Sequence, residues 1–258
     1  MPVKLEMSDP EDLWAEASAL AMLTVGTDGF GATVYPDGAR GDDVGNGWHG
    51  MSWIGGGRAV LYGYDVDASK TRHQVPPMDL LAGGPDWLPW EWLSDMMRRE
   101  QLIQYVFWWD GSSWGRTDYP DGLRDGGYGD TRRDDQVEDA FLAFAEDPKA
   151  AREAFEDLIR AARARTVDRA VIDALQRHLD PENFDIEPDE PFDTDAMLAV
   201  AERAGVTPGS ARPELPPGRG EPADRRVWLL DHLRHWSLFE ERQLTEGIPP
   251  SLCWSPES

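Results

Sequence analysis

The stretch QLIQYVFWWDGSSWGRTDY, residues 101–119, decides the fold of the first half of this chain. Its first nine residues are the strongest strand candidate in the sequence, because β-branched and aromatic side chains are concentrated between Ile103 and Trp109. Asp110-Gly111 is a hairpin turn signal, and residues 113–119 can supply the returning strand. The stretch therefore predicts an antiparallel strand pair.

Similar signals lie upstream of this pair. Two more pairs of strand candidates flank short glycine turns: residues 20–26 and 30–35 around Asp28-Gly29, and residues 48–54 and 58–65 around Gly55-Gly56-Gly57. An N-terminal helix is expected before them, because Ser8 or Asp9 can cap it and Pro10 suits a first helical position. An inserted helix is expected within residues 85–99. We predict an α+β fold whose N-terminal part is a mainly antiparallel sheet of about six strands, followed by a C-terminal helical region.

Glycine marks the change between these two parts, since twenty of the 25 glycines lie in residues 1–130. The rest of the chain carries apolar residues at helical spacing, which predicts a set of helices. They are expected from Asp134, after Asp147-Pro148, over residues 171–179, over residues 196–204 and over residues 223–242.

Two segments of the second half lack a helical pattern. Residues 180–195 hold eight carboxylates and no basic residue, which predicts an acidic loop. Residues 207–222 are rich in proline and glycine, which predicts an exposed linker. We therefore expect a Gly/Trp-rich, mainly-β region over residues 1–132 and a helical region over residues 133–258, packed as one domain or as two.

Charge and cysteine content narrow the possible partners and compartments. The net charge is −24, from 25 basic and 49 acidic residues, which disfavours nucleic acids and anionic membranes as partners. Acidity that serves only solubility is the simplest interpretation, and a basic protein partner is the alternative. The single cysteine, Cys253, cannot form an internal disulfide. With no signal-peptide pattern at the start and no apolar stretch of about 20 residues, we expect a cytoplasmic protein.

Catalytic signatures are weak, which favours a function other than catalysis. The sequence has no Walker loop, GxGxxG, GxSxG or HExxH motif. The best acid/base candidate is His49, which Asp42 or Asp43 could assist near the rim of the predicted sheet. A polar loop residue among turn glycines is the simpler interpretation of His49. The motif Tyr-Pro-Asp-Gly occurs twice, at residues 35–38 and 119–122, and predicts two equivalent strand exits.

A metal site has little support in the sequence. His232 and His235 are three residues apart on the last predicted helix and therefore share a face. Two ligands fall short of the three or four that a zinc site uses, and amphipathic helix residues are the simpler interpretation. We predict no metal and no cofactor.

Tryptophan is unusually frequent, with twelve residues in the chain. Trp87, Trp90 and Trp92 cannot all be buried on one face of the inserted helix, so we expect an exposed tryptophan surface that binds a partner. The acidic loop offers carboxylates that resemble nucleic-acid phosphates in charge, and its partner-binding candidates are Asp185, Asp189 and Asp193.

These features lead to one principal hypothesis and two alternatives. The principal hypothesis is an acidic protein-binding protein, such as an immunity- or antitoxin-type inhibitor or a regulatory partner of a cationic protein. The first alternative is a small-ligand-binding protein or hydrolase-like enzyme, with a site on the sheet rim around His49 and the Tyr-Pro-Asp-Gly loops. The second is a structural protein that docks through its last helix. The sequence leaves the oligomeric state open.

Overall fold

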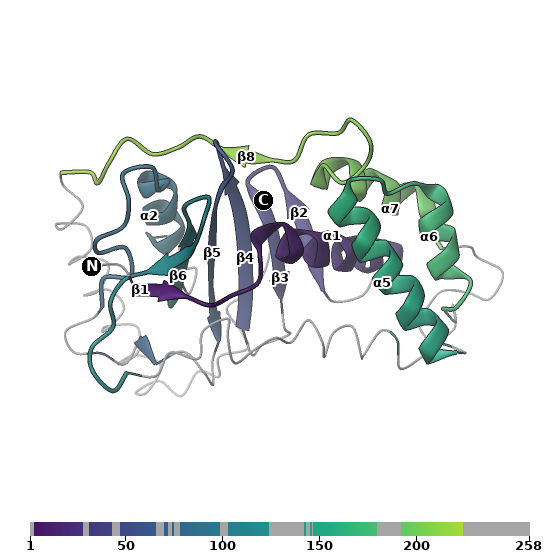
Figure 1. Ribbon diagram of the computed structural model, residues 1–258, viewed down its shortest axis with the longest axis horizontal. Coiled ribbons are helices and arrows are strands. Elements are labelled where there is room, and N and C mark those ends of the chain that lie inside the picture. The colour runs from purple at the N-terminus through teal and green to yellow at the C-terminus, as the bar shows by residue number, and fades with distance from the viewer. Residues whose placement is uncertain are drawn as a thin grey trace, which may run out of the picture.

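The computed structural model describes residues 3–27, 31–42, 47–65, 70–71, 74, 78–98, 103–123, 142, 145, 147–179 and 192–223 (Figure 1). The strands are β1 (Val3–Leu5), β2 (Ala32–Tyr35), β3 (Gly38–Asp42), β4 (Gly47–Ile54), β5 (Arg58–Asp65), β6 (Tyr105–Trp109), β7 (Trp114–Arg116) and β8 (Glu214–Leu215). The helices are α1 (Pro10–Thr27), α2 (Trp90–Arg98), α5 (Pro148–Ala164), α6 (Arg169–Gln176) and α7 (Thr194–Ala204).

One sheet contains all eight strands. Its order is β1-β7-β6-β5-β4-β3-β2, each neighbouring pair is antiparallel, and β8 pairs with β4 in parallel. The hairpin at Asp110-Gly111 and the hairpin at Gly55-Gly56-Gly57 both form, as predicted. The α+β fold with a mainly antiparallel sheet is confirmed, with more strands than the six expected.

Helices cover the two faces of the sheet unequally. Figure 1 shows α2 on one face, and α1 with α5, α6 and α7 on the other. Strand alternation sends Met51 and Leu61 into the core under α1, and Val60 and Val106 into the core under α2. The core under α1 also contains buried residues of α5, α6 and α7. The described parts of the β region and the helical region therefore share one core.

The strand expected over residues 20–26 is wrong, because α1 continues through them to Thr27. Asp9 starts this helix, its Oδ1 accepting a hydrogen bond from the Glu11 amide at 2.8 Å. Leu20 and Leu23 extend the buried face of the helix and pack in the core with α5 and α7. This tertiary packing outweighs the turn signal of Asp28-Gly29, and residues 28–30 lie outside the described part.

The described helices of the second half lie where the sequence predicts them, although α6 begins two residues earlier and ends three residues earlier than expected, and α7 begins two residues earlier. Asp147 caps α5, its side chain accepting from the Ala150 amide, and Asp168 caps α6, accepting from the Val171 amide. Gly205 ends α7 in the left-handed conformation, with φ 71°. Most of the helix expected from Asp134 lies outside the described residues. Almost all of the helix expected over residues 223–242 does so as well.

The exposed linker expected over residues 207–222 is instead part of the fold. We name residues 205–221 the strap, which Figure 1 shows crossing from α7 to α2 over one end of the sheet. Its β8 pairs with β4, and the amides of Gly218 and Gly220 donate to the carbonyls of Trp87 and Asp86 at 2.9 and 2.8 Å. Gly218 permits a close approach to the segment before α2, because a Cβ there would collide with the Leu88 carbonyl, and local sequence patterns do not reveal this contact.

In the described ranges, no helix combines the length and hydrophobicity needed to cross a membrane.

Candidate functional site

The three tryptophans of the inserted segment have different environments. Trp90 is 2% exposed, and its Nε1 donates to the Pro85 carbonyl at 3.2 Å. The expectation that Trp90 belongs to an exposed surface is therefore wrong, because its indole fills the core under α2. Trp87 and Trp92 are half-buried, and the Arg58 guanidinium lies 5.1 Å from the Trp87 ring.

Trp92 leads to a cluster on the β2–β3 hairpin. The first Tyr-Pro-Asp-Gly motif forms the turn of this hairpin, with Tyr35 paired to Gly38. Asp37 Oδ2 accepts from Trp92 Nε1 at 3.3 Å and forms an ion pair with Arg40 at 2.6 Å. The Arg40 guanidinium also lies 4.7 Å from the centre of the Tyr35 ring. We call Tyr35, Asp37, Arg40 and Trp92 the surface cluster.

A buried tyrosine supports this cluster from below. The Tyr62 ring lies over Gly50, where a Cβ would be 2.7 Å from the ring, so only glycine leaves room for it. The Tyr62 hydroxyl lies 3.2 Å from Ser52 Oγ, and it also interacts with Arg40. Trp92 packs edge-on against Tyr62, with ring centroids 5.3 Å apart. Arg40 and Trp92 are therefore held in place from the core.

Burial and charge set the protonation states in this cluster. Burial raises the pKa of Tyr62, and nearby Arg40 only partly offsets that effect. Partial burial acts to lower the pKa of Arg40, but its contacts with Tyr62 and Asp37 raise it above the usual value. At neutral pH the buried Tyr62 is therefore neutral and Arg40 is positively charged.

Tyr35 is the outermost member of the surface cluster. Its side chain is 40% exposed, which makes it one of two exposed large hydrophobic residues in the described part, with Val25. It lies on β2, while the core under α2 takes its strand residues from β4, β5, β6 and β8. Tyr35 and Arg40 thus lie beyond the part of the sheet face that this core covers.

The surface cluster is suited to recognition. Tyrosine, tryptophan and arginine are the residues most enriched at binding hot spots. Ser52, the hydroxyl nearest to Tyr62, is fully buried, so a substrate could not reach it in this conformation. The repeated Tyr-Pro-Asp-Gly motif pointed to Tyr35 and Asp37. Arg40 contacts both of them within the same hairpin, and its contact with Tyr62 is long-range.

The predicted rim site around His49 is not assembled with this cluster. The register pairs His49 with Gly41, over which its ring lies, and strand alternation places it on the same face as Met51, under α1. Asp37 contacts Trp92 on the opposite face. Asp42 is described only by its backbone, which pairs with Trp48, and Asp43 lies outside the described residues.

The two Tyr-Pro-Asp-Gly loops are also far apart in the sheet order. The first joins β2, at one edge, to β3, and the second follows β7, which is next to the other edge. Tyr119 of the second loop packs against the core under α2, and the Arg116 guanidinium lies 3.6 Å from the centre of its ring. A single rim carrying both loops, and a ligand site built from them, does not form.

The remaining predicted site residues have structural roles or lie outside the described part. Asp193 caps α7, its Oδ1 accepting from the Ala196 amide at 2.8 Å. Asp185, Asp189, His232 and His235 lie outside the described residues. In the ranges that are described, no group of three or more His, Cys, Asp or Glu side chains is placed to hold a metal ion.

Acidic residues are distributed unequally between the two faces. The α2 layer comprises two segments, residues 78–98 and residues 117–123. The Thr117 hydroxyl connects them by donating to the carbonyls of Leu80 and Ala82 at 3.0 and 2.8 Å. It contains six acids and one arginine. The helical layer, comprising residues 10–27, 147–179 and 192–204, contains twelve acids and eight lysines or arginines. The α2 layer is therefore the more acidic layer for its size, while the strands beneath it add Arg40 and Arg58 to the same face.

Comparison with known proteins gives no further guide: no protein-family model matches this chain, and no curated protein or solved structure matches it.

Proposed function

We propose that this protein binds a basic protein and acts as its inhibitor or regulatory partner. The observation that supports this best is the charge of the α2 layer, in which six acids stand against one arginine. Asp86, Glu91, Asp118 and Asp121 of this layer are exposed. Acidity that served solubility alone would not need to concentrate on one face, whereas a docking face does.

The same face supplies apolar contact area. Trp87 and Trp92 are half-buried there, and Tyr35 extends the face at the edge of the sheet. Partly exposed aromatic rings surrounded by charged groups are typical of the central residues of protein interfaces. The acidic residues would accelerate and orient the approach of a basic partner, and the aromatic residues would slow its dissociation.

The test is capture of a partner, followed by measurements on purified components. The tagged protein is used to retain proteins from its native cells at low salt and at high salt, and a retained protein is then made recombinantly. We expect a basic protein that binds in a fixed stoichiometry and whose association rate falls as salt rises. Retention of acidic or neutral proteins alone, or of none, would show that the proposal is wrong.

Two triple variants connect the binding to the α2 layer. The first neutralises exposed acids of that layer, with Asp86→Asn, Glu91→Gln and Asp121→Asn. The matched control neutralises three exposed acids of α5, with Glu153→Gln, Glu156→Gln and Asp157→Asn. Both remove the same charge, so only the first should reduce the association rate and its salt dependence if the partner docks on the α2 layer.

A further inference from the structure

Tyr35 and Asp37 retain unused binding capacity. Both hydrogen bonds that Asp37 accepts from described residues end on Oδ2, so Oδ1 is left with acceptor capacity. The Asp37 side chain is 29% exposed, so solvent and partners can reach it. The Arg40 guanidinium lies over one face of the Tyr35 ring, and Tyr35 as a whole residue is 40% exposed.

These groups are preorganised. Arg40 is held by Asp37, by the Tyr35 ring and by Tyr62, which is itself fully buried. Trp92 is fixed by its hydrogen bond to Asp37 and by the Tyr62 ring. Binding to groups that are already ordered loses little conformational entropy, which favours affinity.

We propose that the surface cluster is the contact point for an arginine side chain of the basic partner. The partner's guanidinium donates to Asp37 Oδ1 and lies against the face of the Tyr35 ring opposite Arg40. A guanidinium fits both groups, because it donates in a plane to a carboxylate and stacks on aromatic rings. This inference rests on the proposed function and specifies where the partner is recognised.

Charge decides between the possible occupants of this cluster. A second copy of the chain would bring another net charge of −24, and the two copies would repel each other. A basic partner is attracted by the same field, and the neighbouring α2 contributes the exposed Glu91. The local Asp37–Arg40 pair is neutral as a unit, so the long-range attraction comes from the α2 layer while the cluster provides the specific contact.

The experiment uses the isotope-labelled full chain and two short capped peptides observed by NMR. The probes are Gly-Arg-Gly and Gly-citrulline-Gly, which have nearly the same shape but differ in charge. We expect the arginine peptide alone to shift the indole N–H of Trp92 and the backbone amides of residues 33–35, 37 and 38, in a saturable manner. Shifts that are absent at millimolar peptide, equal for both peptides, or confined to other acidic surfaces would overturn the inference.

A matched pair of variants completes the test. Tyr35→Ser should weaken binding of the arginine peptide, and of the captured basic partner, by about tenfold, as expected for a hot-spot residue. Val25→Ser removes the other large hydrophobic residue that is exposed in the described part of the chain; it lies on α1, is 38% exposed, and its loss should leave binding unchanged. If the captured partner binds Tyr35→Ser as tightly as the wild type, the contact point is wrong while the proposed function stands. If no basic protein is captured, the proposed function itself fails.

Discussion

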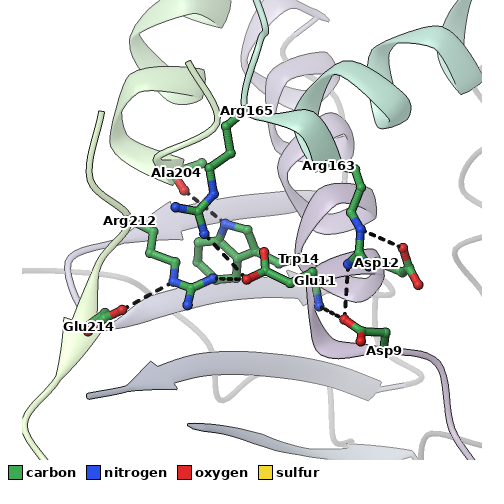
Figure 2. A network of polar contacts seen from close by, with 9 residues as sticks. All are labelled: Asp9, Glu11, Asp12, Trp14, Arg163, Arg165, Ala204, Arg212 and Glu214. Carbon is green, nitrogen blue, oxygen red and sulfur yellow. Dashed lines mark hydrogen bonds and ion pairs between the residues drawn. The ribbon is translucent and has the colours of Figure 1, made fainter. Parts of the chain in front are cut away.

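The guanidinium of Arg212 stacks on the indole of Trp53, with Cζ 3.4 Å from the centre of the ring. Arg212 also forms ion pairs with Glu11 at 2.6 Å and with Glu214 at 3.3 Å, and its side chain is 11% exposed. Figure 2 shows this arginine at the N-terminus of α1, where Arg163 and Arg165 of the helical layer converge on Asp9, Glu11 and Asp12. The strap is thereby fixed to the sheet and to the helical layer at one point.

This geometry predicts that Arg212→Ala destabilises the protein. The variant removes a largely buried cation–π contact and, among the described residues, leaves Glu11 only the longer ion pair to Arg165, so we expect a loss of about 2 kcal/mol in the free energy of unfolding. Urea denaturation measures this value. The control is Arg160→Ala, which removes an ion pair with Asp157 whose arginine is 67% exposed, and should cost less than about 0.5 kcal/mol. Equal losses in both variants would contradict the role of Arg212.

Arg165 is the only non-glycine residue with positive φ in the described part of the chain, at 56°. We predict that Arg165→Gly is more stable than Arg165→Ala by about 1 kcal/mol, because glycine adopts this conformation without steric cost. Both variants lose the same ion pair to Glu11, a 3.4 Å contact of a side chain that is 44% exposed. Thermal and urea unfolding of the two variants provide the comparison, and the reverse order would show that Arg165 is not strained.

Gly50→Ala should disrupt the support of the surface cluster. Its Cβ would lie 2.7 Å from the Tyr62 ring, which is fully buried and cannot move aside without disturbing Ser52 and Arg40. We expect a loss of about 2 kcal/mol in stability, typical of overpacking, and a shift of the Trp92 indole resonance in NMR spectra. Gly55→Ala is the control, since its nearest neighbour is Pro217 at 3.5 Å, an ordinary contact. A stable Gly50→Ala protein with an unshifted Trp92 resonance would refute the argument.

Local signals predicted two of the three expected hairpins and several helix caps correctly, but they missed the β2–β3 hairpin. Asp110-Gly111 joins β6 to β7, and the strand expected over residues 58–65 is β5 without change of bounds. Asp147, Pro148 and Gly205 mark helix ends as expected, because caps depend on residues adjacent in sequence. Such features need no information about the rest of the fold.

Features that depend on distant residues were predicted poorly. Residues 20–26 can be a strand by composition, and only their packing against α5 and α7 makes them helical. The strap resembles a linker, since its contacts with Glu11 and Trp87 join residues far apart in sequence. Trp90 and Arg40 show the same limitation within the site. Burial of Trp90 depends on where α2 lies, and the contact of Arg40 with Tyr62 depends on the pairing of β3, β4 and β5.

The buried Tyr62 should make the stability of the fold depend on pH in the alkaline range. Burial raises its pKa above the ordinary value of about 10, so the folded protein keeps this proton at pH values where the unfolded chain loses it. The associated stability is fully present below about pH 10 and falls as pH rises from there toward the folded pKa, by about 1.4 kcal/mol per pH unit from this group.

Tyr62→Phe should remove that alkaline loss. At neutral pH the variant should be less stable by about 1–2 kcal/mol, because buried Ser52 loses its hydroxyl partner and Arg40 loses the contact that orients it. Urea denaturation across alkaline pH, compared between wild type and variant, isolates the contribution of Tyr62 from those of the other five tyrosines. Parallel stability curves above about pH 10 would mean that Tyr62 titrates alike in both states, and that the surface cluster lacks the buried support inferred for it.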